Sequence, residues 1–186
     1  MEKVNVKIKG VAPLIVHNGQ LANPLYHYSK ELKSLTGKRK KTDDDLKKIA
    51  KLEWFGGLYV EGGKPIIPGV AIESMLVNAA KRDRLGKLFK AGLFTNKNFP
   101  IIYDGPKDLE KLWKDEKFRL TTSVVVKMSR IIRTRPIFPE WQLETEIVYH
   151  PNVLNEVQIM DAFKAAGDFI GLCEWRPKYG RFEIVK

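Results

Sequence analysis

Few residues in this chain have the types and spacing needed for acid–base or metal chemistry. The chain contains three histidines, His17, His27 and His150, and a single cysteine, Cys173. None of them stands in an HExxH or CxxC spacing, and no glycine-rich phosphate-binding motif occurs, so we expect no metal and no cofactor. His17 follows a strand pattern and is a weak candidate for the general base of a metal-independent ribonuclease. A lone histidine in such a place is more often a loop or core residue.

Basic side chains give the stronger signal. The chain has 33 Lys and Arg against 22 Asp and Glu, a formal net charge of +11 and a pI of about 9.6. Such a charge attracts polyanions. Residues 117–139 contain no acidic residue. Their basic residues are Lys117, Arg119, Lys127, Arg130, Arg133 and Arg135.

The arginines of this segment predict contacts to phosphate. On an extended strand Arg133 and Arg135 point to the same face, and guanidinium groups bind phosphate with paired hydrogen bonds. The alternative is a basic sheet edge that discourages aggregation. We expect Lys127, Arg130, Arg133 and Arg135 to bind nucleic acid.

Two further clusters join this predicted interface. The first is a basic turn, Lys38, Arg39, Lys40 and Lys41, whose alternative is a solvated turn. The second is a loop at 175–181 that mixes cations with aromatics and ends in glycine. Its candidate contacts are Arg176, Lys178, Tyr179 and Arg181. The alternative is a structural turn in which Trp175 fills the core.

The hydrophobic pattern predicts an α+β fold. Val4, Val6 and Ile8 alternate with polar residues, which indicates a strand with one buried face. Helices are predicted after the N-cap candidate Thr42, from 69, and from 156, where Asn155 and Gln158 form a capping-box pattern. Residues 118–128 and 131–138 are predicted as two strands or one long ribbon, and further strands at 141–149 and 181–185. This order fits a ferredoxin-like (RRM-type) βαββαβ sandwich in a single domain, 1–186. An insertion at roughly 17–67 separates strand one from helix one, and a second lies at roughly 84–117.

Three segments resemble the RAMP superfamily, which includes the backbone subunits of CRISPR effector complexes. Residues 7–14 (KIKGVAPL) resemble its first strand. Residues 66–76 (IIPGVAIESML) are similar to its "IPGSSLKGxLR" start of helix one. The stretch 170–182, with RPKYGRF, resembles its glycine-rich loop before the last strand, although it has fewer glycines. The chain as a whole resembles phage-borne relatives of the backbone subunit.

The resemblance implies an RRM-like core, single-stranded RNA or DNA as the partner, and head-to-tail stacking as a homo-oligomer along the strand. At the matching helix start, Gly69 exposes free N–H groups that favour a phosphate, with Ser74 one turn later. No cleavage aspartate of the family can be assigned here.

We therefore expect a non-catalytic protein that binds single-stranded nucleic acid. The alternatives are a metal-independent endoribonuclease of the same superfamily, or a phage assembly or mimic protein that docks onto a host nucleoprotein complex. No apolar run of 18 residues and no signal peptide are present, so we expect no membrane partner and a cytoplasmic location, in the host cytoplasm if the protein is phage-encoded.

Overall fold

The structure is a computed structural model in which residues 1–126 and 128–185 are described. It is a mixed α+β structure with several antiparallel sheets, which confirms the predicted class at this level. Residue contacts divide the chain into two compact units. Unit 1 consists of Met1–Ile15, Lys64–Asp104 and Phe138–Lys186, and unit 2 of Val16–Gly63 and Gly105–Ile137. The insertion predicted at 17–67 nearly coincides with the first segment of unit 2.

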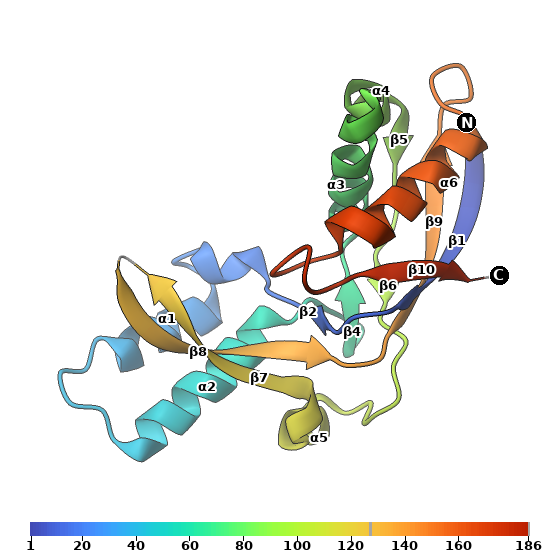
Figure 1. Cartoon of the computed structure of the whole chain (residues 1–186). Coiled ribbons are helices and arrows are strands. Elements are labelled where there is room, and N and C mark those ends of the chain that lie inside the picture. The colour runs from blue at the N-terminus through green and yellow to red at the C-terminus, as the bar shows by residue number, and fades with distance from the viewer. Residues whose placement is uncertain (127, 186) are drawn as a thin grey trace. The chain divides into compact units, whose positions relative to one another are not determined.

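The main sheet of unit 1 has four strands in the order β10, β1, β9, β5, and all neighbours are antiparallel (Figure 1). The strands are β1 (Glu2–Gly10), β5 (Leu93–Phe94), β9 (Gln142–Tyr149) and β10 (Phe182–Val185). The predicted strands at 4–8, 141–149 and 181–185 are thus confirmed. In the register, Lys7 of β1 lies opposite Glu144 of β9 and Val185 of β10.

One face of this sheet is buried. Val4, Val6 and Ile8 of β1 are all buried, as their alternation predicts. Burying each such side chain contributes about 1.5–3 kcal/mol. Helices α3 (Gly69–Ala80) and α6 (Glu156–Ala165) pack beside each other within the same unit (Figure 1).

The starts of the two helices differ. At α6, Asn155 and Gln158 form a capping box, in which each side chain accepts a backbone N–H from the other residue. This confirms the sequence pattern predicted there. At α3, Pro68 is the N-cap and has no side-chain cap bond.

The remaining elements of unit 1 are short. They are β2 (Leu14–Ile15), β4 (Lys64–Ile67), the 3₁₀ turn η2 (Lys81–Asp83), α4 (Gly86–Gly92), β6 (Phe99–Pro100) and the π-helical turn η4 (Ala166–Ile170). β4 pairs with β6 antiparallel. Within the described parts of the chain, no helix has both the length and the apolar character needed to span a membrane.

Unit 2 combines two longer helices with a β-hairpin. Its elements, the last of which ends at the boundary with unit 1, are η1 (Gly19–Ala22), α1 (His27–Thr36), α2 (Asp43–Gly57), β3 (Val60–Glu61), α5 (Leu109–Lys114), η3 (Glu116–Phe118), β7 (Arg119–Val126) and β8 (Ser129–Phe138). Thr42 caps α2 in a capping box with Asp45, which confirms the predicted N-cap. Trp54 of α2 is buried, and its indole N–H donates to the Phe118 carbonyl (2.7 Å).

One strand assignment needs correction. The predicted strands at 118–128 and 131–138 exist as β7 and β8, but they form an antiparallel hairpin in unit 2. In the main sheet, β9 pairs on one side with β1 and on the other side with the two-residue strand β5. A strand this short has no measurable alternation, so the hydrophobic pattern could not identify it.

The loop before β10 depends on a glycine for its own packing. Gly180 has φ +71°, and a Cβ there would overlap the Leu172 carbonyl oxygen. The Leu172 N–H donates to the Gly180 carbonyl (2.9 Å), and the Gly180 N–H donates to the Pro13 carbonyl (2.9 Å). The glycine therefore permits a close approach within the chain, a role that requires no ligand.

Gly180→Ala should lower the free energy of unfolding by roughly 2–4 kcal/mol, because it combines a left-handed backbone with a steric overlap. Urea unfolding followed by circular dichroism measures this loss. Gly19→Ala is the control, since no atom lies within 4 Å of its added Cβ, and it should change stability by less than about 0.5 kcal/mol. Equal urea midpoints for the two variants would contradict the structural role of Gly180.

Candidate nucleic-acid interface

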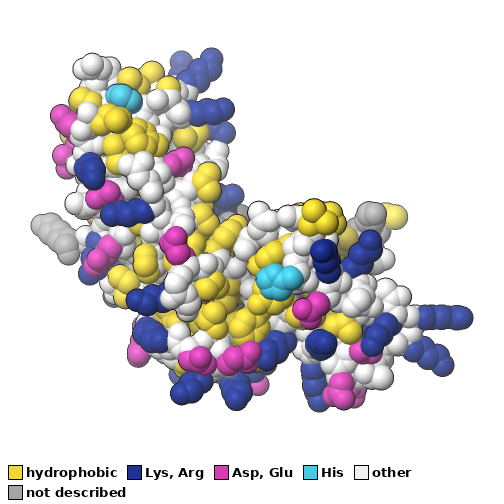
Figure 2. Space-filling model, turned by 180° about the vertical axis from the view of Figure 1, so that it is seen from behind, with side chains coloured by type: hydrophobic (Ala, Val, Ile, Leu, Met, Phe, Trp, Pro, Cys, Tyr) yellow, Lys and Arg dark blue, Asp and Glu magenta, His cyan; other side chains and the backbone are white. Residues whose placement is uncertain are grey.

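The positive charge is unevenly divided between the two units. Unit 2 contains 18 Lys and Arg against 10 Asp and Glu, a net charge of +8. Unit 1 contains 15 against 12, a net charge of +3. On the face shown in Figure 2, cationic and acidic side chains are interspersed. Any interface must therefore be located from individual contacts within each unit.

Two of the predicted arginines meet in a pocket of unit 2. Arg133 and Arg135 of β8 line a cavity of about 420 Å³ together with His17. The same-face geometry expected for residues two apart on a strand therefore holds. The remaining lining comes from η1, α1 and α2, and consists of Gly19, Leu21, Ala22, Leu32, Thr36 and Glu53.

A buried carboxylate holds this pocket together. Glu53 of α2 is only 4% exposed. Its Oε1 accepts from Arg133 Nη1 (2.6 Å), and its Oε2 accepts the Thr134 backbone N–H (2.8 Å). The pair orients the Arg133 guanidinium at the wall of the pocket and also offsets its charge. The acid-free character of 117–139 in sequence thus does not extend to three dimensions.

Sequence analysis did not identify Glu53. The available signal was a charged residue inside an apolar run, Leu52-Glu53-Trp54-Phe55, because an acidic side chain that is fully buried in a helix requires a cationic or hydrogen-bonding partner. The partner lies 80 residues away in sequence, so the pattern alone could not name it.

The loop that presents His17 is anchored by its neighbour. Asn18 is buried, its amide donates to the Leu58 carbonyl (3.0 Å), and its backbone N–H donates to the Gly57 carbonyl (2.8 Å). Its Oδ1 accepts the Gln20 N–H (2.9 Å). These bonds fix the backbone after the histidine, and the Val16 N–H before it donates to the Pro136 carbonyl (3.1 Å), so the position of His17 in the pocket is well defined.

His17 is held in its neutral form. Burial, followed by the charges of Arg135 and Arg133, lowers its pKa from 6.5 to about 4. Its buried Nδ1 has no hydrogen-bond partner among the described residues. A base with so low a pKa accepts protons weakly at neutral pH. The pocket at pH 7 therefore contains two guanidinium groups, one carboxylate and an uncharged imidazole.

The other arginines of the hairpin segment, Arg119 and Arg130, do not line this pocket. The Arg119 guanidinium lies over the Trp113 ring (4.7 Å) and contacts Glu116 (3.2 Å). Arg130 is exposed and reaches Ser123 Oγ across the hairpin (3.4 Å). Lys127, another predicted contact, lies outside the described residues.

The basic turn between α1 and α2 is exposed. Lys38 pairs with Asp45 (2.6 Å), and the Lys41 ammonium donates to the Lys38 carbonyl (2.9 Å). Arg39 and Lys40 are exposed. Thr36 lines the pocket and Lys38 is two residues further along, which places its Cα within about 7.6 Å of that of Thr36. The turn therefore adjoins the pocket.

The loop predicted at 176–181 belongs to unit 1. Arg181 donates to the Asp168 carbonyl (2.7 Å), and the Lys178 ammonium lies 5.7 Å from the centre of the Tyr179 ring. Arg176 and Lys178 are exposed. The glycine of this loop serves the packing of the chain itself, and only its exposed cations remain candidates for contacts.

The predicted phosphate position at the start of α3 is filled by the protein. The Gly69 N–H donates to Asn98 Oδ1 (3.3 Å), and a Cβ on Gly69 would overlap Thr95 Oγ1. Asn98 therefore supplies the acceptor that a phosphate was expected to provide. Ser74 is exposed and faces a separate cavity of unit 1.

The solvent-facing side of the main sheet is charge-neutralised. Lys7 pairs with Glu144 (3.2 Å), while Lys3 (3.5 Å) and Lys97 (3.3 Å) both contact Glu146. RRM sheets that bind RNA present aromatic side chains on which bases stack. This sheet face presents ion pairs in place of such aromatic side chains, so it is a poor candidate for binding bases.

No protein-family model matches this chain, and no curated protein matches it at a significant level.

His17 should make stability depend on pH. Between pH 4 and 6.5 the imidazole is protonated in the unfolded chain but not in the folded chain. The free energy of unfolding therefore falls as pH decreases through this window, and the contribution of His17 to it is fully present above pH 6.5. We expect His17→Asn to reduce the difference in urea midpoint between pH 7 and pH 5. His27→Asn, at an exposed position on α1, should retain the wild-type difference. An unchanged pH dependence in His17→Asn would show that this imidazole is not buried in neutral form.

Proposed function

We propose that this protein binds single-stranded nucleic acid through unit 2, without cleaving it. The observation that carries the proposal is the net charge of +8 on unit 2 together with a pocket that contains two arginines. A phosphate in this pocket would meet Arg133 and Arg135, and the adjoining turn would contribute Arg39 and Lys40. Interactions of this kind are dominated by the phosphate backbone and depend little on base sequence.

The state of His17 favours binding over catalysis. With a pKa of about 4 it is a poor general base at neutral pH and supplies no imidazolium acid. The pocket lining includes no second histidine and no tyrosine among the described residues. An uncharged imidazole beside two guanidinium groups is compatible with a site that holds phosphate without transferring protons.

We further propose that unit 1 is the ferredoxin-like core expected from the RAMP resemblance. The proposal is supported by the chain order β1, α3, β5, β9, α6, β10 and by the sheet order β10, β1, β9, β5. Counted along this βαββαβ series, the sheet order is 4-1-3-2. Unit 2 then comprises two insertions, 16–63 before helix one and 105–137 between strands two and three. Family membership and stacking along a strand remain proposals.

The test removes three cations of unit 2, with Arg135→Gln, Arg39→Gln and Lys40→Gln combined. Arg133 is left in place because its loss would strand the Glu53 carboxylate in the interior at a cost of about 3–5 kcal/mol. Fluorescence anisotropy of labelled poly(dT) and poly(U) oligonucleotides at several salt concentrations measures the effect. We expect affinity to fall about tenfold or more, and the slope of log K against log salt to shrink by about 0.7 for each phosphate that the variant no longer neutralises.

The matched control removes three exposed cations of unit 1, with Lys9→Gln, Lys64→Gln and Lys164→Gln combined. The change in net charge is the same as in the unit 2 variant. None of the three substituted residues lies in the proposed interface, so affinity should remain near the wild-type value. Equal losses in the two triple variants, or no binding by the wild type at low salt, would refute the proposal. Cleavage of a labelled strand in EDTA that disappears in His17→Asn would replace it with the ribonuclease alternative.

Assembly with another protein is the second candidate, and the tip of the β7–β8 hairpin favours it. Val125 (64%), Met128 (98%) and Ile132 (62%) expose large apolar side chains there. Exposed apolar surface of this kind marks interaction sites. In this case Val125→Thr with Ile132→Thr would reduce the mass of an assembly measured by light scattering. Oligonucleotide affinity would be unaffected.

A further inference from the structure

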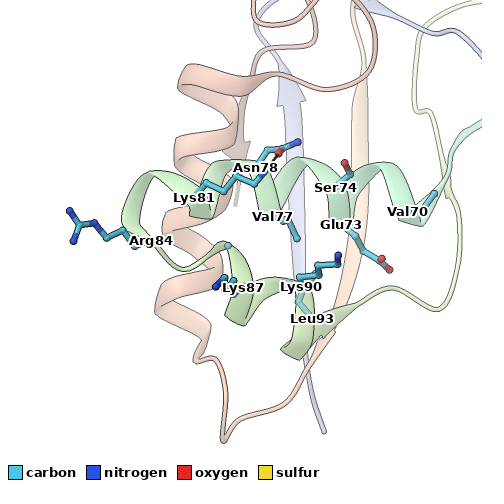
Figure 3. Close-up of a pocket in the computed structure, with 11 residues that line it drawn as sticks. Val70, Glu73, Ser74, Val77, Asn78, Lys81, Arg84, Lys87, Lys90 and Leu93 are labelled. Atoms are coloured by element: carbon cyan, nitrogen blue, oxygen red, sulfur yellow. Dashed lines mark hydrogen bonds between the residues drawn. The ribbon is translucent and has the colours of Figure 1, made fainter.

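A second cavity lies entirely within unit 1, between α3 and α4. Its volume is about 850 Å³, within the range of roughly 300–1,000 Å³ of small-molecule sites. It is lined by Val70, Glu73, Ser74, Val77, Asn78, Lys81, Arg84, Gly86, Lys87, Lys90 and Leu93. Figure 3 shows Val77 projecting from α3 toward α4, with Lys87 and Lys90 projecting from α4.

The cavity wall on α3 follows from helix periodicity. Val70, Ser74, Val77 and Lys81 stand at intervals of four, three and four residues and share one stripe. The opposite face of α3, with Ile72 among others, is buried in the core. Val70 is 67% exposed, although valine gains stability from burial. The helix thus has a second, partly apolar face that opens into the cavity.

The other wall depends on two backbone features. A Cβ on Gly86 would lie 2.8 Å from Lys81 Cγ, so glycine allows α4 to begin close to the end of α3. Arg84, in the turn between them, has φ +62°, a left-handed conformation that costs a non-glycine residue about 1–2 kcal/mol.

The cavity is strongly cationic. Its lining contains Lys81, Arg84, Lys87 and Lys90 against Glu73 alone, a net charge of +3 that equals the net charge of the whole of unit 1. In the described parts of the chain, no carboxylate lies within 4 Å of the charged groups of Lys81, Lys87 or Lys90. Lys81 instead donates to Asn78 Oδ1 (2.8 Å).

The one acidic group in the lining is already engaged. Glu73 Oε1 accepts the Thr95 backbone N–H (2.6 Å) and the Thr95 hydroxyl (2.9 Å). The Glu73 carboxylate therefore interacts with Thr95, just after β5, and does not pair with the lysines. The lysines thus remain available for an external anion.

We propose that this cavity binds a nucleotide. The phosphates would contact Lys81, Lys87 and Lys90, whose ammonium groups are compact charges at the end of flexible side chains and can adjust to a phosphate. The base would pack against Val70, Val77 and Leu93, and Ser74 and Asn78 would offer hydrogen bonds to its edge. An apolar surface beside a cationic rim is complementary to a molecule that has an aromatic base at one end and phosphates at the other. The ligand is either a free nucleoside phosphate or one nucleotide of a strand.

The experiment titrates the full chain with ATP, inorganic triphosphate and a short oligonucleotide, each followed by isothermal calorimetry at low salt. We expect saturable binding of ATP that is at least about tenfold tighter than binding of triphosphate, because triphosphate lacks the base. If the oligonucleotide binds, loses affinity when Lys87 and Lys90 are replaced by glutamine, and ATP binds only weakly, the ligand is a nucleotide of a strand.

Two variants locate the site. Lys87→Gln combined with Lys90→Gln should weaken ATP binding by roughly tenfold or more. Val70→Asp changes an exposed residue, so the fold should persist, and it should weaken binding by placing a carboxylate against the ligand. The matched control is Arg82→Gln with Lys164→Gln, two exposed cations of unit 1 that do not line the cavity.

Equal affinity for ATP and triphosphate, or equal losses in the cavity variants and the control, would overturn the proposal. The triple variant of unit 2 should bind ATP normally, because its substitutions lie in the other unit. A failure of the nucleotide site and a failure of the strand-binding proposal are therefore separable.

Discussion

The need to satisfy a buried carboxylate organises unit 2. Glu53 is excluded from water, and an uncompensated charge in that position would cost several kcal/mol. Its two oxygens are bound by Arg133 and by the backbone of Thr134 on β8, so one helix side chain fixes the position of the hairpin. The alternation of the strand then places Arg135 on the same side as Arg133, opposite the anchored loop that presents His17.

Charge is used in two ways in this chain. On the main sheet of unit 1, lysines and glutamates face each other across strands and neutralise one another, which stabilises pairing but leaves little external field. In unit 2, and in residues 81–90 of unit 1, cations exceed nearby carboxylates. Clustered cationic side chains repel one another, and an anionic partner relieves this repulsion when it binds. Both of our proposals rest on these regions of excess charge.

Local patterns predicted the elements that depend on neighbours in sequence. The alternation of Val4, Val6 and Ile8 predicted β1, and the Asn155–Gln158 spacing predicted the start of α6, because both depend on residues within a few positions. The hairpin β7–β8 was also predicted as strands, but its assignment to the main sheet was wrong. The pairing partner of a strand depends on long-range packing, and β5 is too short to show a pattern.

By itself, the sequence determined the α+β class, the positions of β9 and β10, the starts of α3 and α6, the excess of positive charge and the shared face of Arg133 and Arg135. These follow from composition and from the periods of strands and helices, which are local properties. Only the tertiary structure decided that Glu53 neutralises Arg133, that Asn98 fills the start of α3, and that Val70 and Val77 of α3 line one cavity with Lys87 and Lys90 of α4. Each of these joins residues distant along the chain, and their meeting depends on how the elements pack.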